Sequence, residues 1–367
     1  MSGAQRIIVK VGSSLLVDGD GAVRRGWLET LVADIADAVA AGKRIVIVSS
    51  GAIALGARRL GLAKGGRASL EDAQAAAATG QIALAGCWAE LLSQKGLTAA
   101  QMLVTLDDLE DRRRYLNAAA TLERLLGLGV VPIINENDSV ATAEIRFGDN
   151  DRLAARIAQA AGAQTVVLLS DVDGLHTADP SLDAGATRIE RVEKIDAAIA
   201  ALAGTGTSSG MGSGGMASKI EAARIANAAG ADLVIVSGQH DHPLARLEGG
   251  GCGTVFAADR AARARKAWLA GRLTVKGRVH LDAGAVTALR KGASLLPAGA
   301  TGVEGRFARG DVIDLVGPDG EAVARGLSEY DSDEAALVAG KRSGALAAAL
   351  GHAPRATMVH RDHMVLL

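Results

Sequence analysis

The stretch RIIVKVGSS, residues 6–14, sets a pattern that recurs along this chain of 367 residues: a short β-branched run that ends in small polar residues. Runs of this kind predict strands that are buried on both faces of a sheet. The predicted strands occupy residues 6–11, 44–49, 130–134, 165–170 and 233–237. Between them, alanine- and leucine-rich segments with helical spacing cover residues 27–41, 69–94, 109–127, 151–161 and 216–229. This alternation predicts an α/β fold, with an open and mainly parallel sheet sandwiched by helices.

Polar residues follow four of these strands at the point where each one ends. They are Lys10, Gly12 and Ser13; Ser49, Ser50 and Gly51; Asn135, Glu136, Asn137 and Asp138; and Ser170 and Asp171. Small polar residues also turn the chain and cap helices, and this explains any single group. Ligands of open α/β sheets, however, bind beyond the carboxyl ends of the strands. The four groups together therefore predict one binding site.

Two lysines stand where an isolated positive charge is costly. Lys10 lies inside an apolar strand, so it should reach the strand end or an anionic ligand, unless the strand is at an edge. Lys219 lies in the first turn of the helix that follows the glycine-rich loop MGSGGMASK, residues 211–219. A cation there opposes the helix dipole unless an anion lies beside it. Helix N-termini and glycines favour phosphate, although a flexible linker has the same composition. We expect a phosphate site at this loop.

Two familiar nucleotide-binding motifs do not account for that phosphate site. Gly210, Gly212 and Gly215 match the spacing G-x-G-x-x-G, but no apolar strand runs directly into them. The Gly-Lys pairs at 42–43 and 340–341 are followed by arginine, so neither forms a Walker A motif. The chain is thus predicted to bind phosphate in another way.

Composition narrows the class of protein. The 40 Lys and Arg residues and the 41 Asp and Glu residues leave a formal charge of -1, which gives no overall attraction to nucleic acid or acidic membranes. Cys87 and Cys252 fit neither a disulfide framework nor a metal-binding spacing. The N-terminus shows no apolar signal region, and no stretch approaches the roughly 20 apolar residues of a membrane span. We expect a cytoplasmic protein without a membrane partner.

The pattern of strands and helices changes near residue 260. Residues 238–259 are predicted to be a loop, and 260–274 form an arginine-rich linker. From 275 onward the segments are short and separated by turns, with strands expected near 273–280 and 311–316. We therefore predict a catalytic domain over 1–259, a small β-rich domain over 275–354 and a C-terminal extension over 355–367.

Six motifs, in this order and spacing, resemble the glutamate 5-kinases of the amino acid kinase family. They are VKVGSSLL (9–16), IVSSGAIALG (47–56), INENDSVAT (134–142), FGDND (147–151), LLSDVDGLHTADP (168–180) and GSGGMASK (212–219). The segments GRFARGDVIDL (305–315) and ARGLSEYDSDE (324–334) resemble the PUA domain of bacterial members. The resemblance covers nearly the whole chain. Its departures are conservative, with Ser49, Ser170 and Ser213 where the family often has threonine.

The resemblance implies an amino acid kinase fold, a C-terminal PUA-like domain and a specific reaction. That reaction is the ATP-dependent phosphorylation of the γ-carboxylate of L-glutamate to L-glutamyl 5-phosphate, the first step of proline biosynthesis. ATP and Mg²⁺ are the implied cofactors, and the magnesium ligands stay unassigned. Proline is the implied feedback inhibitor. We also expect a homo-oligomer and a functional coupling to glutamyl phosphate reductase.

The resemblance also implies roles for individual residues. Lys10 and Lys219 would contact the ATP phosphates, and Ser170 and Asp171 would line the nucleotide pocket. The rest of the nucleotide site would comprise Gly12, Ser213, Gly214, Gly215, Met216, Ala217 and Ser218. Glutamate would be bound by Ser50, Gly51, Asp138 and Asn150, with Asp138 meeting the α-ammonium group. Asp149 and Asp151 would orient the lysines or magnesium, and capping of the helix at 151–161 is the alternative.

The proposed chemistry needs no histidine. A γ-carboxylate, with a reference pKa of about 4.3, is already ionised at neutral pH, so its attack on phosphorus requires no general base. Catalysis should consist of positioning and charge neutralisation. One alternative is a family member with another carboxylate, carbamate or phosphate acceptor. The other is an RNA-binding protein that works through the C-terminal domain, but residues 276–354 carry no excess of basic residues, so we expect no RNA binding.

Overall fold

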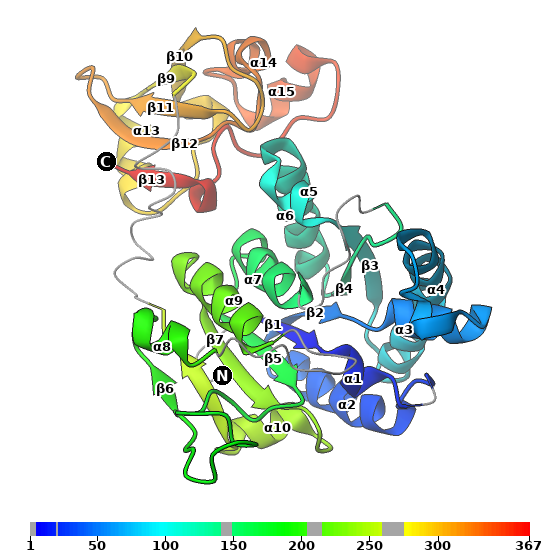
Figure 1. Cartoon of the computed structure of the whole chain (residues 1–367). Coiled ribbons are helices and arrows are strands. Elements are labelled where there is room, and N and C mark those ends of the chain that lie inside the picture. Colours follow the sequence, from blue (N-terminus) through cyan, green and yellow to red (C-terminus); the bar gives the residue numbers. More distant parts are fainter. Residues whose placement is uncertain (1–4, 20, 141–148, 204–214, 259–274) are drawn as a thin grey trace. The chain divides into compact units, whose positions relative to one another are not determined.

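The structure, a computed structural model, describes residues 5–19, 21–140, 149–203, 215–258 and 275–367. The chain divides into two compact units (Figure 1). The first comprises Met1–Glu110 and Ala118–Asp259, and the second comprises Asp111–Asn117 and Arg260–Leu367. The predicted linker, 260–274, lies outside the described residues.

An eight-stranded sheet forms the centre of the first unit, in the order β3-β4-β2-β1-β5-β7-β8-β6. Neighbouring strands from β3 to β7 are parallel, and β8 runs antiparallel to β7. The predicted open, mainly parallel sheet is therefore confirmed. The strands are β1 (Arg6–Val11), β2 (Arg44–Ser49), β3 (Ala99–Val104), β4 (Val131–Glu136), β5 (Thr165–Ser170), β6 (Arg191–Val192), β7 (Asp232–Ser237) and β8 (Gly253–Phe256).

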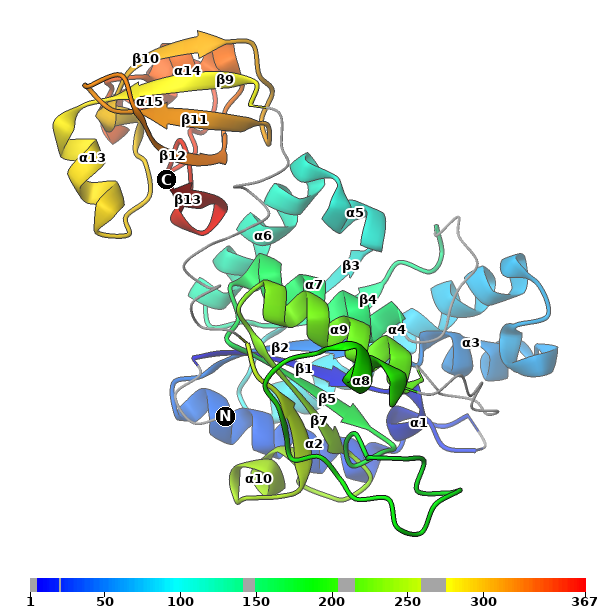
Figure 2. The same cartoon turned by 60° about the vertical axis from the view of Figure 1, so that its left-hand side comes forward.

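Helices cover both faces of this sheet. Figures 1 and 2 show α7 and α9 on one face and α2 and α10 on the other. Beneath α2 and α4, the odd-numbered residues of β1 form one aliphatic core with Trp27 and Trp88. The helices are α1 (Ser13–Leu16), α2 (Arg25–Ala40), α3 (Ala52–Leu60), the 3₁₀ turn η1 (Ala63–Gly66), α4 (Leu70–Gln94), α5 (Leu106–Glu110), α6 (Arg112–Gly127, of which 112–117 belong to the second unit), α7 (Asp149–Ala161), α8 (Ala197–Ala201), α9 (Met216–Ala228) and α10 (Pro243–Glu248).

The prediction that residues 238–259 form a loop is wrong, because they contain α10 and β8. Helix α10 is short, and β8 is a four-residue strand preceded by glycines, so neither shows a full period of its own. The N-terminus of α10 is stabilised from another element: Asp34 accepts hydrogen bonds from the backbone N–H groups of Leu244 (2.9 Å) and Ala245 (3.1 Å). A contact between residues so far apart in the chain has no local sequence signal.

Helix α4 has the length and mean hydropathy, 1.2, of a membrane-spanning helix, and it is the one helix of the described residues that does. The expectation that no stretch approaches that length is therefore wrong. Leu84, Trp88 and Leu92 of α4 are fully buried. Core helices meet the same criteria, so a single such helix is weak evidence for a membrane.

Helices α3 and α4 approach each other through two glycines. A Cβ atom on Gly56 would lie 1.8 Å from the carbonyl oxygen of Ala76, and one on Gly80 would lie 1.8 Å from that of Ala52. The backbones of the two helices are therefore in direct contact. This contact fixes the start of α3, which directly follows Ser50 and Gly51, against the middle of α4.

We expect Gly80→Ala to lower the free energy of unfolding by about 3 kcal/mol, because the methyl group meets backbone atoms that cannot move independently. Urea denaturation of the purified variant measures the effect. Gly86→Ala, on the same helix with nothing within 4 Å of the added atom, is the matched control and should not destabilise the protein. An unchanged denaturation midpoint for Gly80→Ala would contradict the close contact.

The second unit has its own five-stranded sheet, in the order β10-β9-β11-β12-β13. Residues 355–367, predicted as an extension, supply its last strand, which pairs with β12. Two of its strands lie close to the ranges that the sequence predicts. The elements are β9 (Gly277–Leu281), α13 (Ala283–Arg290), η2 (Pro297–Gly299), β10 (Ala300–Gly305), β11 (Val312–Val316), β12 (Ala322–Leu327), α14 (Ser332–Val338), α15 (Ser343–Leu350), η3 (Arg361–His363) and β13 (Met364–Leu366).

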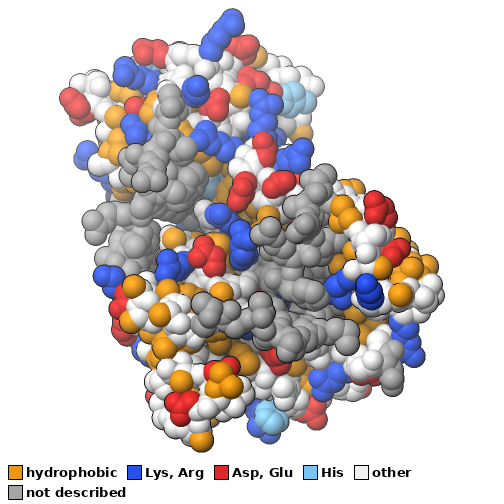
Figure 3. All heavy atoms as spheres, viewed as in Figure 1, with side chains coloured by type: hydrophobic (Ala, Val, Ile, Leu, Met, Phe, Trp, Pro, Cys, Tyr) orange, Lys and Arg blue, Asp and Glu red, His pale blue; other side chains and the backbone are white. Residues whose placement is uncertain are grey.

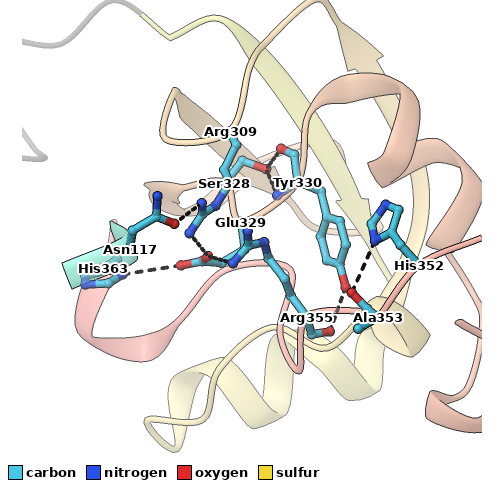
Figure 4. Close-up of polar contacts among 9 residues, drawn as sticks. All are labelled: Asn117, Arg309, Ser328, Glu329, Tyr330, His352, Ala353, Arg355 and His363. Atoms are coloured by element: carbon cyan, nitrogen blue, oxygen red, sulfur yellow. Dashed lines mark hydrogen bonds and ion pairs between the residues drawn. The ribbon is translucent and has the colours of Figure 1, made fainter. Parts of the chain in front are cut away.

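A polar cluster around Glu329 lies inside the second unit (Figure 4). Arg309 lies 3.5 Å from the Glu329 carboxylate, and His363 lies 3.7 Å from it. Burial by itself would raise the pKa of Glu329, but the interactions with His363 and with the charge of Arg309 outweigh it and lower that pKa. Arg309 also donates to the side chain of Asn117. On the face in Figure 3, basic and acidic side chains are interspersed.

Candidate active site

The strand order places four predicted groups of polar residues beside one another. β1 is paired with β2 on one side and with β5 on the other, and β4 lies beyond β2. Because these strands are parallel, their carboxyl ends lie at the same edge of the sheet. Lys10, Ser50, Asn135 and Ser170 all stand at or near those ends.

Lys10 and Lys219 share one carboxylate. The Nζ atom of Lys10 lies 2.6 Å from Oδ1 of Asp151, and that of Lys219 lies 3.1 Å from Oδ2. All three residues are buried, and Asp151 is fully so. Burial by itself would raise the pKa of Asp151, but the charges of Lys10 and Lys219 outweigh it and lower that pKa. We call these three residues the lysine-aspartate trio. Its formal charge is positive.

Three elements build the trio. Lys10 comes from the central strand β1, Asp151 from the first turn of α7 and Lys219 from the first turn of α9. α7 and α9 lie side by side on the same face of the sheet (Figures 1 and 2). The sequence led us to expect an anion beside Lys219. The carboxylate of Asp151 is one such anion, and it belongs to the protein itself.

The trio adjoins backbone positions suited to phosphate. Gly215 is the N-cap of α9 and has no side chain that could cap the helix. The backbone N–H groups of Met216, Ala217 and Ser218, in the first turn, are therefore suited to bind phosphate. A Cβ atom on Gly12 would lie only 3.8 Å from Nζ of Lys10. Three predicted positions cannot be placed in this way: Ser213 and Gly214 lie outside the described residues, as does the side chain of Asp149.

Ser170 and Asp171 end the neighbouring strand β5. The hydroxyl of Ser170 is buried and donates to Oδ1 of Asp171 at 2.9 Å, whereas Asp171 itself is exposed. Within the described residues, these two side chains contact each other rather than the lysines. They are placed on the β5 side of the trio, where the sequence predicts the nucleotide.

Asn150, which precedes Asp151, lies at the centre of a hydrogen-bonded group on the β2 and β4 side. Its Nδ2 atom donates to Oγ of Ser50 at 2.7 Å and to Oδ1 of Asn135 at 3.1 Å. Asn135 in turn donates to Oε1 of Gln81, from α4, at 2.8 Å. The sequence identified Asn135 only as part of a polar strand end, and it did not identify Gln81, since a glutamine on a helix carries no signal of its own.

Asp138 follows β4 and is half-buried, as is Arg67, which follows η1. Burial lowers the pKa of Arg67, and the nearby charge of Asp138 offsets part of that effect. Gly51, the other predicted substrate residue, has a φ of 103° and no room for a side chain beside Val17, so only glycine fits this turn into α3.

The described residues contain no group of three or more His, Cys, Asp and Glu side chains placed to hold a metal ion. Mg²⁺ in phosphoryl-transfer enzymes is commonly bound by one or two carboxylates together with phosphate oxygens. The exposed carboxylate of Asp171 at the strand ends fits this mode of binding.

Comparisons with known proteins show the family of this chain. Residues 5–237 match the model of the amino acid kinase family, and residues 277–350 match that of the PUA domain. Glutamate 5-kinase from Sphingopyxis alaskensis is 69% identical over 362 residues, which cover 99% of this chain and 97% of that protein. Glutamate 5-kinase from Zymomonas mobilis subsp. mobilis is 60% identical, with coverage of 99% and 91%.

Among solved structures, carbamate kinase from Giardia lamblia bound to AMP-PNP aligns with a TM-score of 0.51 at 15% identity. The alignment covers 71% of this chain and 100% of that chain. At this identity the likeness shows the fold alone, and it agrees with the sheet and helix layers described above. The chain therefore belongs to the glutamate 5-kinase group of the amino acid kinase family, with a PUA domain in its C-terminal part.

Proposed function

We propose that this chain transfers the γ-phosphoryl group of ATP to the γ-carboxylate of L-glutamate, giving L-glutamyl 5-phosphate and ADP. The observation that carries the proposal is the buried lysine-aspartate trio at the strand ends. A buried group of charges with a positive sum attracts an anion, and phosphates of ATP are anions that the adjoining helix terminus can also bind. The names of the relatives support glutamate as the acceptor.

The reaction forms a bond between a γ-carboxylate oxygen and phosphorus, and it breaks the bond between that phosphorus and the ADP oxygen. No proton has to move, because the carboxylate is ionised. The residues of the chain would therefore act by position and charge. Lys10 and Lys219 would neutralise the charge that shifts onto the phosphate oxygens, and Asp151 would hold both ammonium groups in place.

Mg²⁺ would be held by Asp171 together with phosphate oxygens, and it would supply further positive charge at the phosphates. Ser170 would fix the Asp171 carboxylate through the hydrogen bond described above. Gly12 and the first turn of α9 would supply backbone N–H donors. Ser213 and Gly214, which lie outside the described residues, are the remaining positions that we assign to the nucleotide site.

Glutamate would bind on the β2 and β4 side, between Ser50, Gly51, Asn150 and Asp138. We expect Asp138→Asn to raise the KM for glutamate about tenfold or more, because it removes the charge that faces the α-ammonium group. The KM for ATP should change less than twofold. Steady-state kinetics with each substrate varied separately makes the measurement. A normal KM for glutamate with weakened ATP binding would assign Asp138 to the other ligand.

An acceptor panel tests the proposed function itself. ADP release would be measured with ATP and L-glutamate, L-aspartate, N-acetyl-L-glutamate, carbamate or a nucleoside monophosphate. We expect L-glutamate to give the highest kcat/KM. A higher value with any other acceptor would replace glutamate by that acceptor while leaving the kinase class in place.

Further parts of the proposal concern the setting of the reaction. We propose a cytoplasmic homo-oligomer in proline biosynthesis, working with glutamyl phosphate reductase and inhibited by proline. Residues 141–148 lie outside the described residues, and they fall between Asp138 and Asn150 in the sequence. We would therefore expect proline to act there. Proline should then raise the apparent KM for glutamate, whereas inhibition that glutamate does not relieve would separate the two sites.

A further inference from the structure

Asn135 has only one possible amide orientation. One of its two terminal atoms lies 2.9 Å from the backbone N–H of Glu136, which can only donate, so that atom must be the oxygen Oδ1. The other atom is therefore the nitrogen, which lies 2.8 Å from Gln81. Since an amide nitrogen only donates, Gln81 must present its oxygen Oε1 to Asn135.

The same reasoning extends to Asn150 and Ser50. The atom of Asn150 that lies 3.1 Å from Oδ1 of Asn135 has to be a donor, so it is Nδ2. This nitrogen also lies 2.7 Å from Oγ of Ser50, which consequently accepts a hydrogen bond there. A hydroxyl that accepts from Asn150 keeps its own proton for another partner. The assignment of these directions starts from the N–H group of Glu136, and Oε1 of Gln81 is the acceptor that holds the other end of the Asn135 amide in the same orientation.

We propose that Gln81 is a positioning residue for the acceptor substrate: through Asn135 and Asn150 it holds the Ser50 hydroxyl so that its proton is donated to the γ-carboxylate. This inference rests on the proposed function. Carboxylates of glutamate only accept hydrogen bonds at neutral pH, so they need donors such as this hydroxyl. Asn150 directly precedes Asp151, which places the group beside the lysines and hence beside the reacting carboxylate.

The packing of α4 fixes the position of Gln81. It is 9% exposed, and the preceding residue is Gly80, which brings α4 into backbone contact with the first turn of α3. Ser50 and Gly51 lie immediately before that turn. Gln81 and Ser50 are thus held at fixed places by the same helix contact, so a hydrogen-bonded chain between them can set the hydroxyl direction.

Gln81→Met keeps the size of the side chain but removes the acceptor, which leaves Nδ2 of Asn135 buried without its partner. We expect kcat/KM for glutamate to fall roughly tenfold, with the KM for ATP within twofold of the parent. Gln81→Glu retains an acceptor oxygen and should stay within about threefold of the parent. Gln94→Met, at the exposed end of the same helix, is the matched control and should leave both parameters unchanged.

The decisive comparison is the double variant Ser50→Ala/Gln81→Met. If Gln81 acts through the Ser50 hydroxyl, the double variant is no slower than Ser50→Ala alone. Two independent losses that multiply would overturn the inference, and so would a folded Gln81→Met enzyme with the parental kcat/KM. If Gln81→Met does not fold, Gln81→Glu decides the matter, because a folded Gln81→Glu enzyme that loses tenfold or more also overturns it.

Failure of this inference is distinguishable from failure of the proposed function. A parent enzyme that does not phosphorylate glutamate refutes the function regardless of Gln81. If the parent does phosphorylate glutamate, multiplicative losses in the double variant or a parental kcat/KM in Gln81→Met refute the positioning role alone.

Discussion

We expect Lys219→Ala to lower kcat about a hundred- to a thousandfold at saturating ATP and glutamate. Lys219 is 4% exposed, so bulk water cannot replace its ammonium group with an equally oriented charge. Removing one such preorganised electrostatic contact typically costs about 2.7 to 4 kcal/mol in the transition state. A lysine on a flexible linker would behave differently, since surface substitutions usually change free energies by less than about 0.5 kcal/mol.

Steady-state kinetics on a variant whose fold is verified by circular dichroism makes this measurement. Lys95→Ala, which removes an exposed lysine after α4, is the matched control and should leave kcat unchanged. Lys10→Ala should show a loss comparable to that of Lys219→Ala. If both lysines act on the same phosphates, as we propose, the double variant should lose less than the product of the two losses. A folded Lys219→Ala enzyme with a kcat within threefold of the parent would show that residues 211–219 do not form a phosphate site.

We expect Asp151→Asn to destabilise the protein by about 3 to 5 kcal/mol, because it removes the shared partner of two buried ammonium groups. The substituted amide has nearly the same shape, so the effect isolates the charge. The kcat should also fall, since Lys10 and Lys219 lose the carboxylate that positions them. Urea denaturation at neutral pH gives the stability, and Asp37→Asn, which changes an exposed carboxylate of α2, is the control.

The pH dependence of this effect has a definite sign. The folded-state pKa of Asp151 lies below its ordinary value of 3.8, so its charge stabilises the fold at every pH above that value. The difference in unfolding free energy between parent and Asp151→Asn should therefore be constant above about pH 5 and shrink as the pH falls below about 4. A difference that shrinks between pH 8 and 6 would contradict a carboxylate held ionised by two lysines.

The strands that carry the site were predictable because they are buried on both faces. Residues 6–11, 44–49 and 165–170 are aliphatic runs without alternation, and β1, β2 and β5 occupy those same bounds. The edge strand β3 was not predicted, since its sequence AAQMLV is half exposed and contains one β-branched residue. Its pairing with β4, rather than its own composition, makes it a strand.

The site was predictable only in part, for a physical reason. A positive charge is unfavourable inside an apolar strand, where Lys10 lies, and at the N-terminus of a helix, where Lys219 lies. The local sequence therefore identifies each lysine as unusual. The contact of both lysines with Asp151 brings together three segments that are far apart in the chain. No local sequence pattern predicts it. Gln81 is still harder to predict from the sequence, because its role depends on the backbone contact between α3 and α4 that Gly80 allows.

Transfer of a labelled oxygen tests the central claim most directly. The enzyme would be incubated with ATP and L-glutamate carrying ¹⁸O in the γ-carboxylate, and hydroxylamine would trap the acyl phosphate and release phosphate. If the γ-carboxylate attacks phosphorus, the released phosphate carries one ¹⁸O atom from glutamate, seen as an isotope shift in its ³¹P spectrum. Phosphate without the label would show that water, and not glutamate, had accepted the phosphoryl group, and it would contradict the proposed reaction.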